Sequence, residues 1–331
     1  MVSIVMPAKN AQPYLEECLK SIINQNYKNW ELLVVNDHSK DNTQSVLEDF
    51  AAMDSRITVL VNKGEGIIPA LKLAYKNAKG DYITRMDADD IMPLHKLNFM
   101  VKQLEESGKG YIATGNVLYF ADGEPGEGFK QYADWLNGLA KNGTQFDEIF
   151  KECVIPSPCW MLHRSDFDLI GGFDSLVYPE DYDLAFRMYN HNLKPIPVGE
   201  VLHYWRDHKN RASRNDPNYA DDTFTAIKVK YFLKIHYKED RQVNILGAGR
   251  RGKKLALALK ENKISFNWYG INPAKVGKHI YDVLIQDFNV SAIEDKNQLL
   301  ITFTRNNSTA SKELRFLPKN LNLNQDYFFF A

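Results

Sequence analysis

The sequence contains little cysteine. Only Cys18, Cys153 and Cys159 occur among its 331 residues. A small secreted protein held together by disulfides carries a dense and even set of cysteines, so this sparse, odd set argues against that class. His163 lies near the last two, but the spacing is not that of a zinc finger. We therefore expect buried free thiols and a reducing cytoplasmic environment.

The sequence also lacks a long hydrophobic run. No segment approaches the ~18 consecutive apolar residues that a membrane-spanning helix needs. The N-terminus leads directly into the apolar residues 2–6, without the basic stretch and cleavage site of a secretory signal. We expect a cytoplasmic protein. A lipid-bearing substrate would still bring it to the inner face of the membrane, so peripheral membrane association stays open.

Neither sign of charge is in excess. The chain has 41 Lys and Arg against 42 Asp and Glu, a formal net charge of −1. Neutralising the phosphates of a nucleic acid needs a clear excess of basic residues, so we expect no nucleic-acid partner. The hydrophobic content of 44% and the charged content of 25% are those of an ordinary globular protein.

The first 115 residues alternate short apolar runs with helical periodicity, which is typical of parallel strands joined by crossover helices. Leu15, Cys18, Leu19 and Ile22, for example, fall on one face of a helix. Strands are expected at residues 3–6, 31–35, 57–61, 82–86 and 111–114. The pattern predicts an α/β fold whose ligand binds beyond the carboxyl ends of the strands.

The length allows roughly two domains at about 150 residues each. Periodicity fades after residue 115 and returns around residues 153–161, and the polar residues 238–241 precede a new strand at 243–246. We expect one domain over residues 1–237 and a small α/β domain over residues 238–331.

Two carboxylates, Asp87 and Asp89, follow the strand expected at 82–86. Paired carboxylates are hard oxygen ligands suited to Mg²⁺ or Mn²⁺, which would bridge to substrate phosphates. The structural alternative is that they cap a helix over residues 91–101. The spacing alone leaves both interpretations open.

A second acidic group, Glu180 and Asp181, opens another helical run. Negative charge there offsets the helix macrodipole by about 0.3–1 kcal/mol, which would be a purely structural role. The preceding turn at residues 171–174 can aim the group back toward a cleft, where a carboxylate could act as a general base.

A third cluster, residues 203–214, combines histidines and basic side chains around Trp205. Cations suit a diphosphate, and an indole offers a face to a sugar or base. Each histidine taken alone is more often structural.

Together with residues 4–10 and 33–41, these clusters resemble the family-two glycosyltransferases. The similarity covers about residues 1–235, with five motifs in the family's order: Pro-x-x-Asn, Asn-Asp-x-Ser-x-Asp, Asp-x-Asp-Asp, Gly-Gly-Phe-Asp and Glu-Asp-Tyr-Asp. The resemblance implies the GT-A fold, a mostly parallel sheet between helices. It also implies a nucleotide-sugar donor, usually a UDP-sugar, a divalent cation (Mn²⁺ or Mg²⁺), and transfer with inversion to a glycan or lipid-linked saccharide.

The resemblance further implies roles for individual residues. Residues 1–115 would bind the donor, and 116–237 would form the acceptor half and a closing loop. Asp181 would be the catalytic base with Glu180 beside it, and Asp87 and Asp89 would hold the metal-diphosphate, with Asp89 the direct ligand. The remaining donor-binding residues would be Pro7, Ala8 and Asn10 around the nucleoside, Asp37 on the base, and Arg206 and His208 on a mobile loop over the phosphates.

Three positions depart from the common family pattern. Asn36 replaces a frequent Asp, His38 a frequent Gly, and Lys9 an aromatic that often covers the base. These departures concern recognition of the donor base more than the reaction. No Gln-x-x-Arg-Trp segment of processive synthases occurs, so we expect single additions.

The C-terminal segment carries Gly247-x-Gly249-x-x-Gly252 after a strand, with a helix expected over residues 253–261. The acidic residue that would hold a ribose about 20 positions on is missing, since Asn272 follows the next strand. The segment resembles small Rossmann-like half-domains beside sugar-transfer modules, and we favour a structural or regulatory role. Residues 327–330 are expected to form a buried edge strand.

Two other functions stay open from the sequence. One is an NAD(P)-dependent sugar-modifying enzyme that uses Gly247–Gly252. The other is a non-catalytic nucleotide- or glycan-binding module in which the acidic clusters only cap helices.

Overall fold

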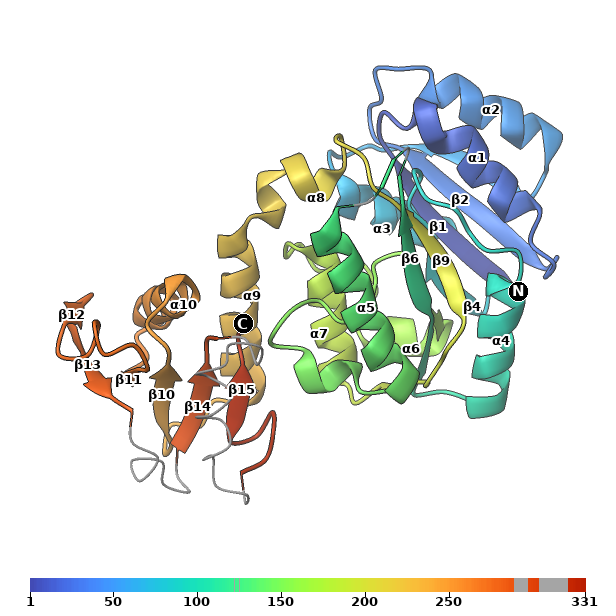
Figure 1. Cartoon of the computed structure of the whole chain (residues 1–331). Coiled ribbons are helices and arrows are strands. Elements are labelled where there is room, and N and C mark those ends of the chain that lie inside the picture. Colours follow the sequence, from blue (N-terminus) through green and yellow to red (C-terminus); the bar gives the residue numbers. More distant parts are fainter. Residues whose placement is uncertain (122, 125, 289–296, 304–320) are drawn as a thin grey trace. The chain divides into compact units, whose positions relative to one another are not determined.

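The computed structural model describes residues 1–121, 123–124, 126–288, 297–303 and 321–331. The chain forms two compact units (Figure 1). The first comprises Met1–Gln145 and Val154–Asn215, and the second comprises Phe146–Cys153 and Asp216–Ala331. Helix α9 (Asp221–Ile235) groups with the second unit. The domain boundary at residue 238 stays a prediction.

The first unit is built on a seven-stranded sheet with the order β3-β2-β1-β4-β7-β5-β8. Its strands are β1 (Val2–Ala8), β2 (Trp30–Asn36), β3 (Ile57–Val61), β4 (Tyr82–Arg85), β5 (Tyr111–Thr114), β7 (Trp160–His163) and β8 (Lys194–Pro195). β7 runs antiparallel to both of its neighbours, and the other pairs are parallel. A separate parallel pair joins β6 (Asn116–Phe120) to β9 (Val201–Arg206). All five strands expected from the apolar runs are confirmed.

Helices cover both faces of this sheet. The helices of the first unit are α1 (Gln12–Ile23), α2 (Thr43–Met53), α3 (Ile67–Asn77), α4 (Lys96–Ser107), α5 (Glu127–Asn142), α6 (Arg164–Leu169), α7 (Glu180–Asn190) and the short α8 (Ala212–Asn215), of which α5 packs on β6. Alternate β1 residues, such as Ile4 and Met6, join one buried cluster with α1, α2 and α4. α3 also packs on β1 and β2, but its buried residues lie outside that cluster. The expected sheet between helices is therefore confirmed.

The strand register brings three loops to one edge of the sheet. Ala8 at the end of β1 pairs with Asn36 at the end of β2, and Val5 pairs with Arg85 at the end of β4. Because these strands are parallel, the segments that follow them emerge side by side. The edge so formed carries Asn10, Asp37 and Asp87.

The helix expected over residues 91–101 is displaced. α4 begins only at Lys96, with His95 at its N-cap, and Ile91 instead forms a bridge to Tyr204. Pro93 accounts for the late start, since it lacks an amide hydrogen and disfavours helix at the residue before it. The carboxylates of residues 87–90 therefore do not cap this helix.

The second unit contains a six-stranded sheet with the order β12-β13-β11-β10-β14-β15. Its strands are β10 (Gln242–Leu246), β11 (Phe266–Gly270), β12 (His279–Ile280), β13 (Val283–Asp287), β14 (Asn297–Ile301) and β15 (Tyr327–Phe329). All pairs are parallel except β12 with β13. β15 is a buried edge strand, as expected, and the helix expected near residue 253 is α10 (Arg250–Glu261).

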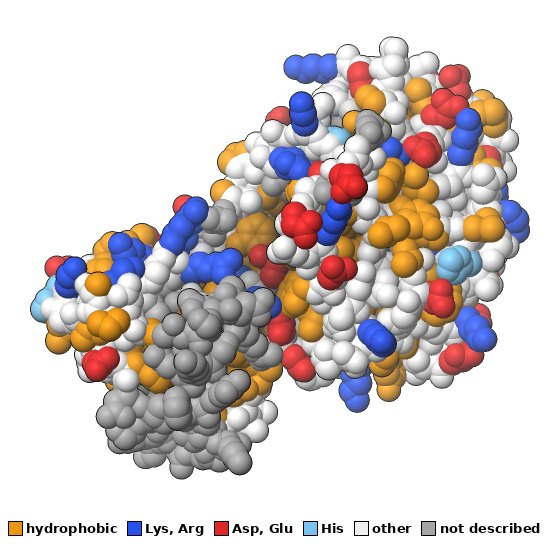
Figure 2. Space-filling view, in the orientation of Figure 1, with side chains coloured by type: hydrophobic (Ala, Val, Ile, Leu, Met, Phe, Trp, Pro, Cys, Tyr) orange, Lys and Arg blue, Asp and Glu red, His pale blue; other side chains and the backbone are white. Residues whose placement is uncertain are grey.

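Both signs of charge share the surface. On the face that Figure 2 shows, Lys and Arg side chains are interspersed with Asp and Glu. No helix in the described residues is long and apolar enough to cross a bilayer. All three cysteines are buried, as expected. The absence of a nucleic-acid partner stays a prediction.

Backbone conformation and packing explain two glycines of this motif, Gly247 after β10 and Gly252 in α10. Gly247 has φ +110°, in the region that favours glycine. A Cβ on Gly252 would lie 2.1 Å from the carbonyl oxygen of Gly247. Close packing of the helix on the strand therefore requires glycine at residue 252 whether or not a ligand binds.

Replacing Gly252 with Ala should lower the free energy of unfolding by about 1–3 kcal/mol, because the methyl group meets rigid backbone. Gly249→Ala is the matched control, since its Cβ meets nothing within 4 Å. As Gly249 is the N-cap of α10, we expect a loss of at most about 1 kcal/mol there. Urea denaturation of the full chain measures both, and equal losses would contradict the packing explanation.

Candidate functional site

Three carboxylates form an acidic turn, Asp87–Asp90, directly after β4. The side chains of Asp87 and Asp89 are 22% and 27% exposed, whereas that of Asp90 is 1% exposed. Burial raises the pKa of Asp87, and the charge of Asp89 raises it further. Although burial opposes it, a hydrogen bond from His208 and the charge of Arg211 lower the pKa of Asp89. Asp89 is therefore the carboxylate of the turn best suited to stay ionised and meet a cation.

Residues at the end of β9 contact this turn. His208 Nε2 lies 2.8 Å from Asp89 Oδ2, and Nδ1 of the same ring has no hydrogen-bond partner among the described residues. Arg206 is the last residue of β9 and is 7% exposed. Its Nε donates to the carbonyl of Asp89 at 2.8 Å, and its guanidinium lies over the ring of Phe120. The sequence predicts Arg206 on a mobile loop, but strand pairing and these contacts hold it in the sheet.

The second acidic group opens α7, and a buried arginine joins it to the acidic turn. Arg85 Nε donates to Asp87 Oδ1 at 2.8 Å, and Arg85 Nη1 donates to Glu180 Oε1 at 2.9 Å. The side chains of Arg85 and Glu180 are 6% and 7% exposed. The structure thus brings the two predicted acidic groups together through a residue that the sequence reasoning missed. An arginine inside an apolar strand was its only sequence signal.

Asp181 lies beside this ion-pair network and is partly exposed. Burial, followed by the negative charge of Glu180, raises the pKa of Asp181 to about 7. Its Oδ1 accepts a hydrogen bond from the amide of Tyr182 at 2.8 Å. A carboxylate with such a pKa can both accept and release a proton near neutral pH. Asp183 lies in the same first turn of α7. Negative side chains at this end of a helix are stabilised by the macrodipole, so the acidic group also has a structural role.

The predicted base-binding residue, Asp37, is 3% exposed and bound by three protein donors. Asn62 Nδ2 lies 2.7 Å from Oδ1, the amide of Gly66 lies 3.1 Å from the same oxygen, and Lys9 Nζ lies 3.1 Å from Oδ2. Lys9, which stands where the family often has an aromatic residue, therefore forms an ion pair with Asp37. Asn62 follows β3 at the same sheet edge, which could have identified it from the sequence.

The other predicted nucleoside residues occupy the same edge. Asn10 has φ +50°, and its Oδ1 accepts a hydrogen bond from the amide of Lys40 at 2.8 Å. Ala8 is buried and Pro7 is partly exposed. The segments after β1 and β2 are thereby fixed to each other.

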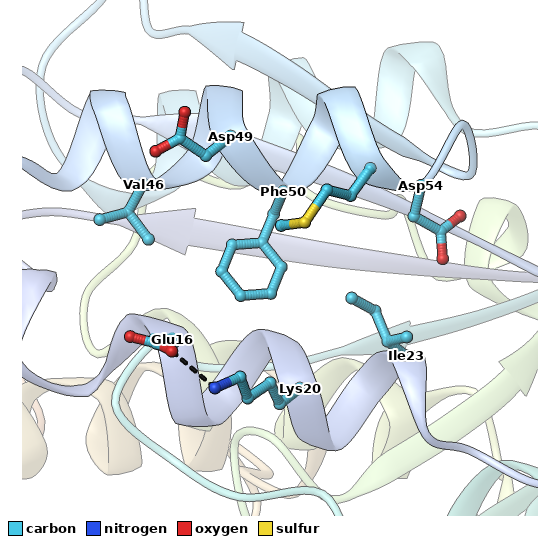
Figure 3. A pocket seen from close by; sticks show the side chains of 8 residues that line it. Glu16, Lys20, Ile23, Val46, Asp49, Phe50 and Asp54 are labelled. Atoms are coloured by element: carbon cyan, nitrogen blue, oxygen red, sulfur yellow. Dashed lines mark hydrogen bonds and ion pairs between the residues drawn. The ribbon is translucent and has the colours of Figure 1, made fainter.

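A cavity elsewhere in the first unit contains none of the predicted site residues. It has a volume of about 600 Å³ and lies between α1 and α2, as Figure 3 shows. Its lining consists of Glu16, Lys20, Ile23, Val46, Asp49, Phe50, Met53 and Asp54. The candidate site is instead the edge formed by the acidic turn and the start of α7.

No group of three or more His, Cys, Asp or Glu side chains in the described part of the chain forms a ready metal site. The donor chemistry nevertheless fits a cation shared with substrate. Asp87 and Asp89 supply partly exposed carboxylate oxygens, and Mg²⁺ and Mn²⁺ commonly complete their shell with phosphate and water. These two residues would hold the ion.

Comparison with known proteins agrees with this geometry. The family described as glycosyl transferase family 2 matches residues 3–171, just over half of the 331 residues. The chain belongs to this family. Its first unit has the GT-A type fold that the resemblance implied.

Two curated relatives illustrate the sequence similarity. An uncharacterized glycosyltransferase of Haemophilus influenzae is 41% identical over 43% of this chain and 45% of its own length. The Escherichia coli protein WfgD, named a UDP-Glc:alpha-D-GlcNAc-diphosphoundecaprenol beta-1,3-glucosyltransferase, is 29% identical over 65% of this chain and 80% of its own. This chain spans 45% of the length of the Haemophilus protein, and it spans 31% and 62% of the length of two further curated matches.

Two solved structures share the fold. TarS 1–349 of S. aureus in complex with UDP-GlcNAc has a TM-score of 0.54 at 16% identity, covering 78% of this chain and 71% of that one. The mannosyltransferase PcManGT from Pyrobaculum calidifontis, in complex with GDP-Man and Mn²⁺, has a TM-score of 0.52 at 20% identity, covering 70% and 63%.

Replacing Arg85 with Met should lower the free energy of unfolding by about 3–5 kcal/mol at pH 8, because the buried carboxylate of Glu180 and the partly exposed carboxylate of Asp87 lose this cation. The loss should shrink toward pH 5. Burial raises the pKa of Asp87 and the charge of Arg85 lowers it, so without Arg85 this pKa lies further above its value in the unfolded state, and acid protonates the carboxyl and stabilises the variant. Urea denaturation at both pH values measures this.

Lys20→Met is the matched control, since it removes the cation of an exposed pair with Glu16. We expect a change of at most about 1 kcal/mol in that variant. A loss in Arg85→Met no larger than this would contradict the importance of the buried network.

Proposed function

We propose that this protein is an inverting, metal-dependent glycosyltransferase that moves a sugar from a nucleotide-sugar, a UDP-sugar in the first instance, to a glycan or lipid-linked saccharide. The observation that carries the proposal is that Arg85 joins Asp87 of the acidic turn to Glu180. The residue after Glu180 is Asp181, whose pKa is about 7. The names of WfgD and of the TarS and PcManGT complexes support this donor and acceptor chemistry. They also support a place in polysaccharide biosynthesis.

The donor would lie along the edge formed by the ends of β1, β2 and β4. Pro7, Ala8 and Asn10 would border the nucleoside, and Asp37 with its partner Lys9 would meet the base. Asp89, with Asp87, would hold Mn²⁺ or Mg²⁺, which neutralises charge on the departing diphosphate when bound. His208 and Arg206 add basic groups on the same side of the turn.

Asp181 would act as the general base. Its carboxylate takes the proton of the acceptor hydroxyl while the hydroxyl oxygen forms a bond to the anomeric carbon. The bond from that carbon to the diphosphate breaks on the opposite face, and the electron pair leaves with the diphosphate, so the configuration inverts. Glu180 supports the base by holding Arg85 and by raising the pKa of Asp181. A cytoplasmic location, at the inner face of the membrane for a lipid-linked acceptor, completes the proposal.

The pH dependence of transfer tests the base. Because Asp181 must be deprotonated, kcat/KM should be level above about pH 8 and fall tenfold per pH unit well below its pKa of about 7. The rate of UDP release, measured with acceptor present, gives this profile. A profile that stays level down to pH 5 would contradict the assignment.

Asp181→Asn should abolish transfer at every pH while leaving UDP binding measurable, because the amide cannot accept the proton. Asp134→Asn makes the same charge change at an exposed position of α5 and should leave the profile unaltered. Full activity in Asp181→Asn would exclude Asp181 as the base.

Thermal shift in the presence of Mn²⁺ tests the donor and the metal together. A ligand at 100 times its Kd stabilises the folded state by about 2.7 kcal/mol, so the matching member of a UDP-, GDP- and dTDP-sugar panel should raise Tm. EDTA or Asp89→Ala should remove that rise, with Asp134→Asn as control. An equal rise in EDTA would rule out the metal role.

A further inference from the structure

A chain of buried polar groups, Lys96, His203 and Asp90, joins α4 and β9 to the acidic turn. We propose that His203 and Lys96 are positioning residues, which hold β9 in register with the acidic turn and thereby set the place where His208 meets Asp89. The inference rests on the proposed function, since it assigns these residues to the cation-binding side of that site.

The chain has three members from three elements. The side chains of Lys96 on α4 and His203 on β9 are fully buried, and that of Asp90 is 1% exposed. Lys96 Nζ lies 3.4 Å from His203 Nδ1, and His203 Nε2 lies 2.9 Å from Asp90 Oδ2. Lys96 Nζ also donates to the carbonyl of Pro158 at 2.6 Å. An ammonium can only donate, so Nδ1 accepts from Lys96 and Nε2 carries the proton donated to Asp90.

The backbone of β9 completes the attachment. The amide of Arg206 donates to Asp90 Oδ1 at 2.8 Å, so both oxygens of Asp90 accept from β9. Ile91 and Tyr204 exchange two backbone hydrogen bonds of 3.1 Å each. A slip of β9 by one residue would unpair all of these groups at once. The strand therefore has one register relative to the turn.

The register decides the position of His208, two residues beyond the end of β9. Its Nε2 lies 2.8 Å from Asp89 Oδ2, the carboxylate proposed to meet the cation. Apolar side chains of similar volume could fill the buried space with equal or greater stability, but they have no directional bonds. The polar chain thus serves to orient His208 toward Asp89 rather than to stabilise the fold.

Variants of His203 test the inference through Mn²⁺ binding, which electron paramagnetic resonance measures in the presence of UDP and without turnover. His203→Leu should weaken Mn²⁺ binding about tenfold or more, as is typical when residues supporting a metal ligand are lost. His203→Gln can still donate to Asp90 and accept from Lys96, so its affinity should stay within about threefold of the wild type.

Thr114→Val is the matched control. It removes a buried hydrogen bond of 2.8 Å, from Thr114 Oγ1 to the carbonyl of Cys159, and among the described residues no hydrogen bond joins Thr114 to the acidic turn. We expect unchanged Mn²⁺ affinity in this variant. Equal affinities in His203→Leu and Thr114→Val would overturn the positioning role.

Two further comparisons keep the test decisive. If His203→Leu does not fold, Lys96→Met keeps the side-chain volume and should weaken Mn²⁺ binding by more than about threefold, and unchanged affinity would overturn the inference. If the wild type binds no Mn²⁺ with UDP, then the proposed function fails. If instead the wild type and His203→Leu bind Mn²⁺ equally well, then only the positioning role fails.

Discussion

The candidate site depends on the two ion pairs that the buried guanidinium of Arg85 makes with carboxylates. The Arg85 side chain lies between Asp87, which follows β4, and Glu180, which opens α7, and it is 6% exposed. Carboxylates this close repel each other when they are taken out of water, so a cation between them allows them to share one edge of the sheet. The same arrangement leaves Asp181 outside the ion pairs with a raised pKa. Glu180, which pairs with Arg85, is thus a structural carboxylate, whereas its neighbour Asp181 is able to exchange a proton.

The acidic turn shows how a single motif divides its tasks. Asp87 and Asp89 are partly exposed, whereas Asp90 is internal and receives hydrogen bonds from β9. The two partly exposed carboxylates are those proposed to hold a cation, and the buried one accepts hydrogen bonds that attach the turn to β9. In the second unit, too, a residue of a sequence motif has a structural explanation: glycine is needed at residue 252 because α10 lies close to the backbone that follows β10. A glycine fingerprint there identifies tight packing before it identifies a ligand.

Much of the fold could be predicted from the sequence. Each expected strand of the first unit is present, because the apolar run that marks a buried strand is local in the sequence. The helix expected over residues 91–101 is present but begins at Lys96, because Pro93 and the pairing of Ile91 with Tyr204 override the apolar pattern at its predicted start. Arg206 was expected on a loop for the related reason that its partners, Phe120 and the acidic turn, are distant in sequence.

The sequence by itself determined the α/β class, the edge of the sheet that carries the candidate site, and the acidic residues on it, since these follow from local patterns and from the geometry of parallel strands. Only the tertiary structure decided how those residues are paired. Arg85 and Glu180 are 95 positions apart, and Asp90 and His203 are 113 apart. The pKa of Asp181 and the partner of each buried charge depend on such contacts, because the energy of a charge in a protein is set by its neighbours in space.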